Sequence, residues 1–287
     1  MRLITYHSPS GPRVAGMRDN YFIDLNQADP GVPACIKKLL AQGPECIGRA
    51  QEALAAGKPI PPGEFRPAPP IPNPEKIICV GLNYTDHARE TGALAPPEPI
   101  LFCKFSSAVC GDRQPIVLPR ISKEVDFEAE LVVVIGRGGR HIALDDAMQH
   151  VGGYCCGNDV SARDWQLRKP GGQWLLGKSF DTFASFGPAI YTADEISQPN
   201  NLKIQLRLNG QVMQNSSTTQ LIFPVDFLVS YISDICTLAP GDLIFTGTPP
   251  GVGFARKPPI FLKPGDLVEV EIEKLGLLRN PVVAEKV

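Results

Sequence analysis

Residues 125–135 read Val-Asp-Phe-Glu-Ala-Glu-Leu-Val-Val-Val-Ile, and this stretch decides much of the fold. After Phe127 it is apolar apart from Glu128 and Glu130, and most of its second half is β-branched, which predicts a largely buried strand. Because side chains alternate along a strand, both glutamates point to the same side. Two carboxylates side by side in a buried strand cost much free energy unless a cation lies between them.

A third acid follows about thirty residues later. Asp159 lies in residues 157–166, which read Gly-Asn-Asp-Val-Ser-Ala-Arg-Asp-Trp-Gln. We hypothesise that Glu128, Glu130 and Asp159 hold one divalent metal ion. Carboxylates without a nearby histidine or thiolate favour a hard cation, Mg²⁺ or Mn²⁺. The alternative is a solvated acidic edge with Asp126 as its third member, and the two glutamates alone favour that alternative because charged side chains are mostly exposed.

Two basic residues follow these acids. Arg163 stands four residues after Asp159, and Lys178 lies in the largely apolar segment Gln-Trp-Leu-Leu-Gly-Lys-Ser-Phe of residues 173–180. A forked guanidinium suits a substrate carboxylate, and a lysine suits an oxyanion that develops during a reaction. The alternative for each residue is a structural salt bridge, which is the better prediction for an isolated basic residue.

An acid–base pair is predicted earlier in the chain. His87 and Glu90 are three residues apart, so on a helical turn they share a face and can hydrogen-bond. A carboxylate beside an imidazole raises its basicity and fixes its tautomer, as proton transfer requires. The following segment, residues 91–99, is rich in proline and predicts a loop or lid. The alternative is a surface ion pair.

A hydroxyl is predicted at the end of another buried strand. Residues 243–253 read Leu-Ile-Phe-Thr-Gly-Thr-Pro-Pro-Gly-Val-Gly, so the strand runs into a turn rich in glycine and proline. Thr248 would be offered there with little side-chain bulk around it. It either faces a substrate or forms part of a tight turn, and the spacing does not decide between the two.

Composition limits the functional classes. The 287 residues are 43% hydrophobic and 20% charged with a net charge of −2, which gives no electrostatic case for binding nucleic acid or an anionic membrane. None of the eight cysteines forms a C-x-x-C pair, so we expect reduced thiols in a cytosol-like compartment. We find no signal segment and no long apolar run. We therefore expect a cytoplasmic protein, or one of the mitochondrial matrix where a transit peptide has been removed.

The chain divides into three parts. Residues 1–58 predict a small N-terminal α+β domain with strands over 3–6 and 21–25 and helices over 34–42 and 45–56. Residues 59–74 are half proline, which predicts a stiff linker. Residues 75–287 predict a metal-dependent catalytic domain of mostly short strands, with a hairpin at Asn209-Gly210, a strand over 267–273 and helices over 145–151 and 225–236. The lack of regular helix–strand alternation argues against a doubly wound nucleotide-binding fold.

Five segments in this order resemble the fumarylacetoacetate hydrolase family over residues 76–283, and most closely its branch that includes the oxaloacetate tautomerases. These segments are Gly-Leu-Asn-Tyr-Thr-Asp-His (81–87), Asp-Phe-Glu-Ala-Glu-Leu (126–131), Asn-Asp-Val-Ser-Ala-Arg-Asp (158–164), Leu-Gly-Lys-Ser-Phe (176–180) and Thr-Gly-Thr-Pro-Pro-Gly-Val-Gly (246–253). The similarity to that branch is strongest at Arg-Asp-Trp-Gln (163–166) and Gln-Trp-Leu-Leu-Gly-Lys (173–178). One position departs from the pattern, because Leu82 stands where some members carry an arginine.

The resemblance implies a mixed α/β, mostly β fold with a β-roll catalytic domain, in a homodimer that binds Mg²⁺ or Mn²⁺. By motif match, the metal ligands would be Glu128, Glu130 and Asp159. The substrate site would be lined by Arg163, Gln166, Lys178 and Thr248, and the lid dyad would be His87 and Glu90.

The implied reaction begins with an enolisable 2-oxo acid and passes through a metal-bound enolate that Lys178 helps to hold. His87, assisted by Glu90, would move the proton or activate water. Oxaloacetate tautomerisation or decarboxylation is the first expectation. Hydrolysis of an acylpyruvate-type C–C bond, as in fumarylpyruvate or acylpyruvate hydrolases, is the alternative. A non-catalytic binder of metal and 2-oxo acid is a third hypothesis, but it would not need an acid–base pair.

Overall fold

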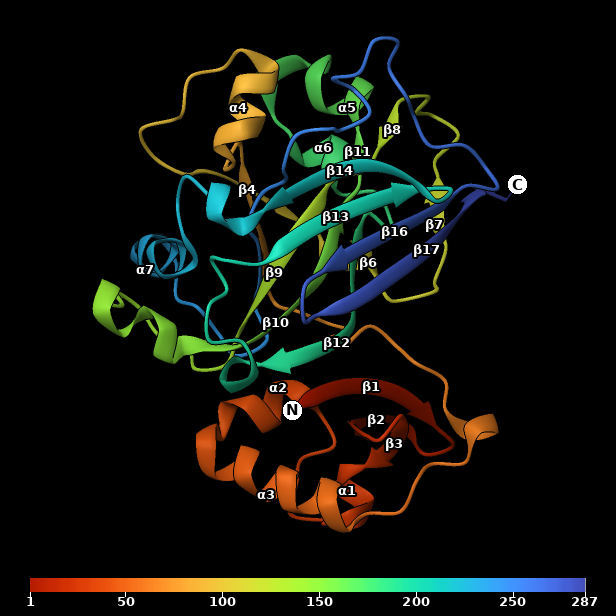
Figure 1. The fold of residues 1–287 in the computed structure, drawn as a ribbon, viewed down its shortest axis with the longest axis vertical. Coiled ribbons are helices and arrows are strands. Elements are labelled where there is room, and N and C mark those ends of the chain that lie inside the picture. The colour runs from red at the N-terminus through yellow and green to blue at the C-terminus, as the bar shows by residue number, and fades with distance from the viewer. Residues whose placement is uncertain (287) are drawn as a thin grey trace.

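A computed structural model describes residues 1–286, and strands dominate the fold (Figure 1). The largest sheet consists of β1 (Arg2–Ser8), β2 (Gly11–Arg18), β3 (Tyr21–Asp24), β4 (Ile77–Gly81), β5 (Ile100–Lys104), β6 (Val109–Cys110), β9 (Ala129–Ile135), β10 (Val151–Asp159), β12 (Ala184–Thr192) and β15 (Leu243–Phe245). Their order is β3-β2-β1-β12-β10-β9-β15-β4-β5, with β6 beside β12. The mixed, mostly β fold is confirmed.

Two smaller sheets complete the β structure. The first contains β7 (Ile116–Leu118), β13 (Lys203–Leu208), β14 (Gln211–Ser217), β16 (Leu267–Ile272) and β17 (Gly276–Ala284), in the order β14-β13-β16-β17-β7. The second pairs β8 (Val125–Asp126) with β11 (Ser161–Ala162). In Figure 1, β13, β14, β16 and β17 cross in front of β9 and β10, the strands of the large sheet that carry Glu130 and Asp159.

Mostly short helices pack around these sheets in the described part of the chain. The α-helices are α1 (Leu25–Ala28), α2 (Ile36–Ala41), α3 (Gly43–Ala56), α4 (Thr85–Thr91), α5 (Arg163–Leu167), α6 (Leu175–Lys178) and α7 (Val225–Ile235). The 3-10 helices are η1 (Pro62–Glu64), η2 (Ser106–Ala108), η3 (Leu144–His150), η4 (Pro170–Gly172), η5 (Ala193–Glu195) and η6 (Thr218–Gln220). The helix predicted over residues 145–151 is therefore a 3-10 helix, whereas the α-helix predicted over 225–236 is confirmed. Among residues 1–286, every helix is too short or too polar to cross a membrane.

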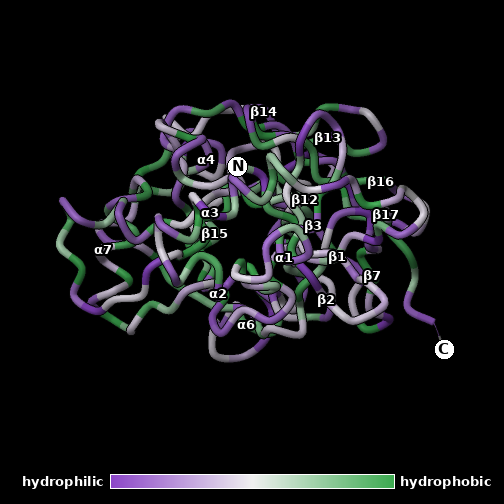
Figure 2. The backbone as a smooth tube through the Cα atoms, turned by 90° about the horizontal axis from the view of Figure 1, so that it is seen from below, coloured by the Kyte–Doolittle hydropathy of each residue, from purple (hydrophilic) through white to green (hydrophobic). Residues whose placement is uncertain are grey.

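The N-terminal unit joins the main sheet directly. β1 pairs with β12, so that Leu3 lies opposite Ile190, and the N-terminal amino group lies 2.9 Å from the Glu195 carboxylate. Figure 1 shows this unit as the red and orange layer below the rest of the molecule. The predicted strands and helices of this unit lie close to β1, β3, α2 and α3, whereas β2 and α1 were not predicted. The division at residues 59–74 stays a prediction. The hydropathy colouring in Figure 2 shows the last residues before the C-terminus as a hydrophilic tail that projects from the body.

The segment of residues 125–135 is not one strand. It divides into β8 and β9, which belong to different sheets, so the single strand predicted over residues 125–135 is wrong. The reason is that side chains accept these backbone hydrogen bonds. The Phe127 amide donates to the Asp126 carboxylate and the Glu128 amide donates to Asn158 Oδ1 of β10, instead of to a backbone carbonyl oxygen of a neighbouring strand. All seven residues of β9 are buried, as predicted.

The hairpin at Asn209-Gly210 is confirmed. β13 and β14 pair on either side of it, and both turn residues have positive φ, 53° at Asn209 and 78° at Gly210. This left-handed backbone is what a two-residue hairpin turn requires, and asparagine and glycine adopt it most readily. The strand predicted over residues 267–273 is present as β16, beside β13.

Candidate active site

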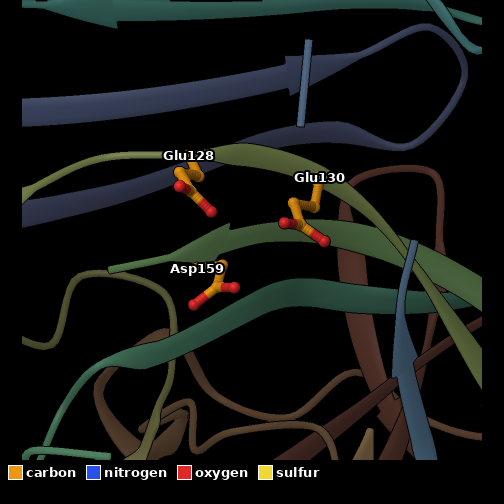
Figure 3. A group of neighbouring side chains, drawn as sticks. All are labelled: Glu128, Glu130 and Asp159. Atoms are coloured by element: carbon orange, nitrogen blue, oxygen red, sulfur yellow. The ribbon is translucent and has the colours of Figure 1, made fainter. Parts of the chain in front are cut away.

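The three predicted metal ligands meet in one place. Oxygen atoms of Glu128, Glu130 and Asp159 all lie within 4.8 Å of one another, and all three residues are buried (Figure 3). The pairing of β9 with β10 causes this, because Glu130 lies opposite Gly157, and the Asp159 amide then donates to the Glu128 carbonyl oxygen at 2.9 Å. The alternative of a solvated acidic edge is wrong, since Asp126 is also fully buried.

Two buried cations lie against these acids. Lys178 Nζ is 2.8 Å from Glu128 Oε2 and 2.9 Å from Asp159 Oδ2. Arg163 Nη2 is 2.8 Å from Asp126 Oδ2 and 2.6 Å from Glu128 Oε1. Arg163 and Lys178 therefore hold the acids in place and also line the same cavity. Asp126 belongs to this cluster through Arg163, and it also accepts hydrogen bonds from the amides of residues 253 and 254.

The two glutamates have opposite electrostatic environments. Burial raises the pKa of Glu128, but the charges of Lys178 and Arg163 outweigh it and lower that pKa to about 2. The pKa of Glu130 is raised well above its ordinary value by burial and by the negative charges of Asp159 and Glu128. Glu130 Oε2 accepts a hydrogen bond from the Gly247 amide at 2.7 Å. In the described part of the chain, Glu130 forms no ion pair.

These residues fit a divalent metal ion. Three buried carboxylates offer oxygen atoms within one coordination sphere, and the unbalanced charge of Glu130 is what a cation would neutralise. Oxygen-only donors suit a hard cation of the Mg²⁺ or Mn²⁺ type. A dication at this position would also reverse the effect of the neighbouring acids on Glu130, because it favours ionised ligands.

The predicted acid–base pair lies on the short helix α4. His87 Nδ1 is 2.9 Å from Glu90 Oε2, and Glu90 Oε1 accepts a hydrogen bond from the Gly251 amide at 2.9 Å. Asp86 anchors the same helix by accepting a hydrogen bond from the Ser216 hydroxyl at 2.6 Å. The dyad is thus fixed on two sides, and His87 lines the cavity that Glu128, Glu130 and Lys178 also line.

The cavity has a volume of about 110 Å³ and a mixed lining. Charged and polar side chains line it together with four apolar residues, Val80, Leu82, Phe102 and Trp174. The rings of Phe102 and Trp174 meet edge to face with centroids 5.3 Å apart. Leu82 has a φ of 51°, a left-handed conformation that is uncommon for leucine. A small substrate would meet both charged groups and apolar surface.

Gln166 and Thr248 also reach the cavity. Arg163 Nη1 donates to Gln166 Oε1 at 2.9 Å, which leaves the Gln166 amide nitrogen for other partners. The Thr248 hydroxyl donates to the Ala129 carbonyl oxygen at 3.0 Å and accepts from Gln214 Nε2 at 2.8 Å. All of the predicted site residues line the cavity except Asp159, which lies against Lys178, and Glu90, which lies behind His87.

Sequence reasoning missed three buried polar residues that support the site. Asn158 and Gln214 accept hydrogen bonds from the amides of residues 128 and 129, which fixes the backbone that carries the glutamates. Lys104 lies 2.6 Å from Asp159 Oδ1 and is fully buried. The one signal in the sequence is a lysine at the end of the short strand Ile100–Lys104, and its partners lie 56 to 79 residues away along the chain. Spacing could not have found them.

A buried carboxylate cluster with paired cations, an imidazole–carboxylate dyad and a small enclosed cavity define a metal-dependent enzyme that acts on small molecules. The family model described as fumarylacetoacetate (FAA) hydrolase C-terminal matches residues 76–283, and the chain belongs to this family. The resemblance found in the sequence is therefore confirmed.

Similar proteins span almost the whole chain. Oxaloacetate tautomerase FAHD2A, mitochondrial, of Homo sapiens is 48% identical over 99% of this chain and 92% of its own length. Oxaloacetate tautomerase fahd2, mitochondrial, of Xenopus laevis is 49% identical over 99% of this chain and 90% of its own. The structure of maleylpyruvate hydrolase from Sphingobium sp. SYK-6 in complex with manganese(II) and pyruvate is 29% identical, with a TM-score of 0.83 and full coverage of both chains.

Proposed function

We propose that this chain is a tautomerase of small enolisable 2-oxo acids, with oxaloacetate as the leading substrate, and that it requires Mg²⁺ or Mn²⁺. One observation carries the proposal: His87 lines the same 110 Å³ cavity as Lys178 and two of the three clustered carboxylates. Acid–base, charge-stabilising and metal-binding groups therefore surround one small substrate. The relatives at 48–49% identity are named oxaloacetate tautomerases, which supports the choice of substrate.

Each side chain has a role in this proposal. Glu128, Glu130 and Asp159 hold the metal ion, which supplies Lewis-acid polarisation of the C2 carbonyl when bound. The Gln166 amide nitrogen is placed to donate to a substrate carboxylate, because Arg163 already satisfies its oxygen. Thr248 offers its remaining lone pair from the same side.

Proton transfer falls to the dyad. Because His87 Nδ1 is bound to Glu90, Nε2 is the nitrogen left for the substrate. His87 takes the proton from C3 of the keto form, and the electron pair of the broken C–H bond moves through C2 to its oxygen. Lys178, at the same cavity, stabilises the resulting negative charge. Return of the proton to that oxygen gives the enol, so atoms and electrons balance without a co-reactant.

A related enolate, that of pyruvate, would form at the same C2 oxygen if the C3–C4 bond broke instead. Loss of CO₂ from oxaloacetate gives decarboxylation, and attack of water on a C4 ketone gives hydrolysis of an acylpyruvate. The likeness to maleylpyruvate hydrolase favours this hydrolysis as the second candidate. Leu82 argues against the hydrolase and decarboxylase alternatives. It lines the cavity where some family members carry an arginine, and its apolar side chain removes one contact for a substrate carboxylate.

Proton NMR of the products tests the proposal. Oxaloacetate and an acylpyruvate are each incubated with the protein, with Mg²⁺ or Mn²⁺ or with a chelator. We expect accelerated keto–enol exchange of oxaloacetate that the chelator abolishes. Accumulation of pyruvate would indicate decarboxylation, and cleaved acids from the acylpyruvate would indicate hydrolysis. Absence of all three with metal present would contradict the proposal.

We further propose a homodimer in a reducing compartment, the cytoplasm or the mitochondrial matrix. β5 is the last strand of the large sheet, and both Ile100 on it and Phe105 just after it are exposed, which supports pairing with a second copy. The eight free thiols support a reducing compartment, and the similar tautomerases are named as mitochondrial. Light scattering coupled to gel filtration tests the dimer, because a monomeric mass would contradict it.

A further inference from the structure

Lys104 is a buried charge that the proposed reaction does not use. It is the last residue of β5, and its side chain is fully buried. Its ammonium group donates to three carbonyl oxygens, those of Val160 at 3.1 Å, Lys178 at 2.5 Å and Phe183 at 2.8 Å. Lys104 thus joins the backbone just after Asp159 to the backbone of Lys178.

Lys104 also contacts the acid cluster. Its Nζ lies 2.6 Å from Asp159 Oδ1, and both side chains are fully buried. Lys178 contacts the other oxygen of the same carboxylate, Oδ2, at 2.9 Å. Asp159 therefore faces two buried ammonium groups, and the charge of Lys104 acts on it at short range.

The charges around the cavity explain why such a cation is needed. Within the described part of the chain, four buried carboxylates meet there, those of Asp126, Glu128, Glu130 and Asp159. Three buried cations face them, Lys104, Arg163 and Lys178. With every group ionised, the cluster carries one negative charge. A bound dication makes it positive by one, which suits an anionic substrate. Without Lys104, the metal-loaded cluster would be neutral.

We propose that Lys104 is a positioning residue that sets the charge of this site, so that the loaded site attracts an anion at some expense of metal affinity. The inference rests on the proposed function, because it takes the carboxylates to be metal ligands. It predicts effects of opposite sign. Loss of the Lys104 charge strengthens binding of the dication and weakens binding of the anion, whereas loss of a merely structural lysine weakens both.

Two neutral substitutions test this prediction. Lys104→Met removes the charge and the donors, and Lys104→Gln removes the charge but keeps an amide donor. Calorimetry measures Mn²⁺ binding to the chelator-treated protein, and then the binding of oxalate, a small dianion with adjacent carboxylates, to the Mn²⁺-loaded protein. We expect Mn²⁺ affinity to rise about tenfold and oxalate affinity to fall about tenfold in both variants, since one charge at this range acts strongly in a buried site.

A matched control is Lys76→Gln. Lys76 also pairs with a buried acid, Asp242, at 2.9 Å, but that pair lies outside the cavity. This variant should lose thermal stability and leave both affinities unchanged. If both neutral Lys104 variants lost Mn²⁺ and oxalate affinity together, Lys104 would be structural only and the inference would be overturned.

Lys104→Arg keeps the inference testable where the neutral variants do not fold. It retains the charge but cannot place the same three donors. We expect both affinities to stay within about threefold of the wild type even where the melting temperature falls. A tenfold joint loss would overturn the inference, because geometry alone would then matter. Since all readouts are binding, its failure leaves turnover by the wild-type protein untouched, whereas failure of the wild type to bind Mn²⁺ would contradict the proposed function.

Discussion

Two buried clusters of polar residues, one around Asp24 and one around Glu130, differ in how fully the protein satisfies the acid. In the N-terminal unit, Asp24 accepts hydrogen bonds from the Tyr6 hydroxyl at 2.6 Å, the Gln27 amide at 2.7 Å and the Arg13 guanidinium. In the cavity, Glu130 accepts one from the Gly247 amide and lies beside two further acids. The protein supplies Asp24 with several hydrogen-bond donors and a countercharge, whereas it supplies Glu130 with one donor and no ion pair among the described residues.

The pKa directions express this difference. Burial raises the pKa of Asp24, but hydrogen bonds from Arg13 and Tyr6 outweigh it, so the net shift is downward. The pKa of Glu130 is raised by burial and by its acidic neighbours. A protein that buries an acid for stability surrounds it with donors, and one that leaves charge unmatched has room for a ligand. An unsatisfied acid is therefore the more informative sign of function.

The largest expected effect concerns the cluster around Glu130. Glu130→Gln keeps the shape of the side chain but removes the charge that a metal would neutralise. We expect metal-dependent turnover of oxaloacetate to fall by about a thousandfold, with a matching loss of Mn²⁺ affinity. Glu269→Gln is the control. Glu269 of β16 forms an ion pair with Arg279 of β17 at 3.0 Å, and it does not line the cavity. Full activity of Glu130→Gln would remove the reason for distinguishing the two clusters.

The next effect separates proton transfer from metal binding. His87→Asn should lower kcat by about a hundredfold, as expected when a general acid–base group is lost, and leave Mn²⁺ affinity unchanged. His141→Asn is the matched control, since His141 has a similar 2.9 Å contact with Asp234 but is exposed. An unaltered kcat in His87→Asn would place the acid–base group elsewhere in the cavity, with Lys178 as the nearest candidate.

The third effect concerns the cluster around Asp24. Asp24→Asn leaves Arg13 unpaired beside a buried amide, and we expect it to lower the free energy of unfolding by about 2 kcal/mol, less than for a fully buried pair because Arg13 is partly exposed. Urea unfolding measures the loss. Mn²⁺ affinity should not change, and a parallel fall in affinity would show that the two clusters are not independent.

The smallest effect has the opposite sign. The pKa of Glu130 is higher in the folded protein than in the unfolded chain, so folding favours the protonated carboxyl. Ionisation of Glu130 therefore destabilises the metal-free protein as the pH rises above 4.5, the ordinary pKa of a glutamate. Glu130→Gln removes that cost. We expect the metal-free variant to be more stable than the wild type by about 1 kcal/mol at neutral pH, with the gain vanishing below the ordinary pKa. Thermal melts across pH measure it, and a gain that grew towards acid would contradict the assignment.

The sequence was most informative where one local rule sufficed. Alternating or periodic apolar residues located β16 and α7, and Asn209-Gly210 located a hairpin. The order of five motifs located the three acids that meet in the structure and the pair His87 and Glu90. The same rules failed at Phe127 and Glu128, where side-chain acceptors replace the ladder bonds of a strand. Hydrophobic pattern does not record such substitutions, so the break between β8 and β9 could not be predicted.

By itself, the sequence determined which residues carry chemistry, because residue type fixes whether a side chain can bind a cation, hold an anion or move a proton. Only the tertiary structure decided how those charges are balanced. Glu128 forms ion pairs with two cations, whereas Glu130, two residues away, forms none with the residues that the structure describes. Lys104 acts on Asp159 from another strand, 55 positions away in the sequence. Electrostatic energy depends on distance and burial, and both are set by how distant segments pack.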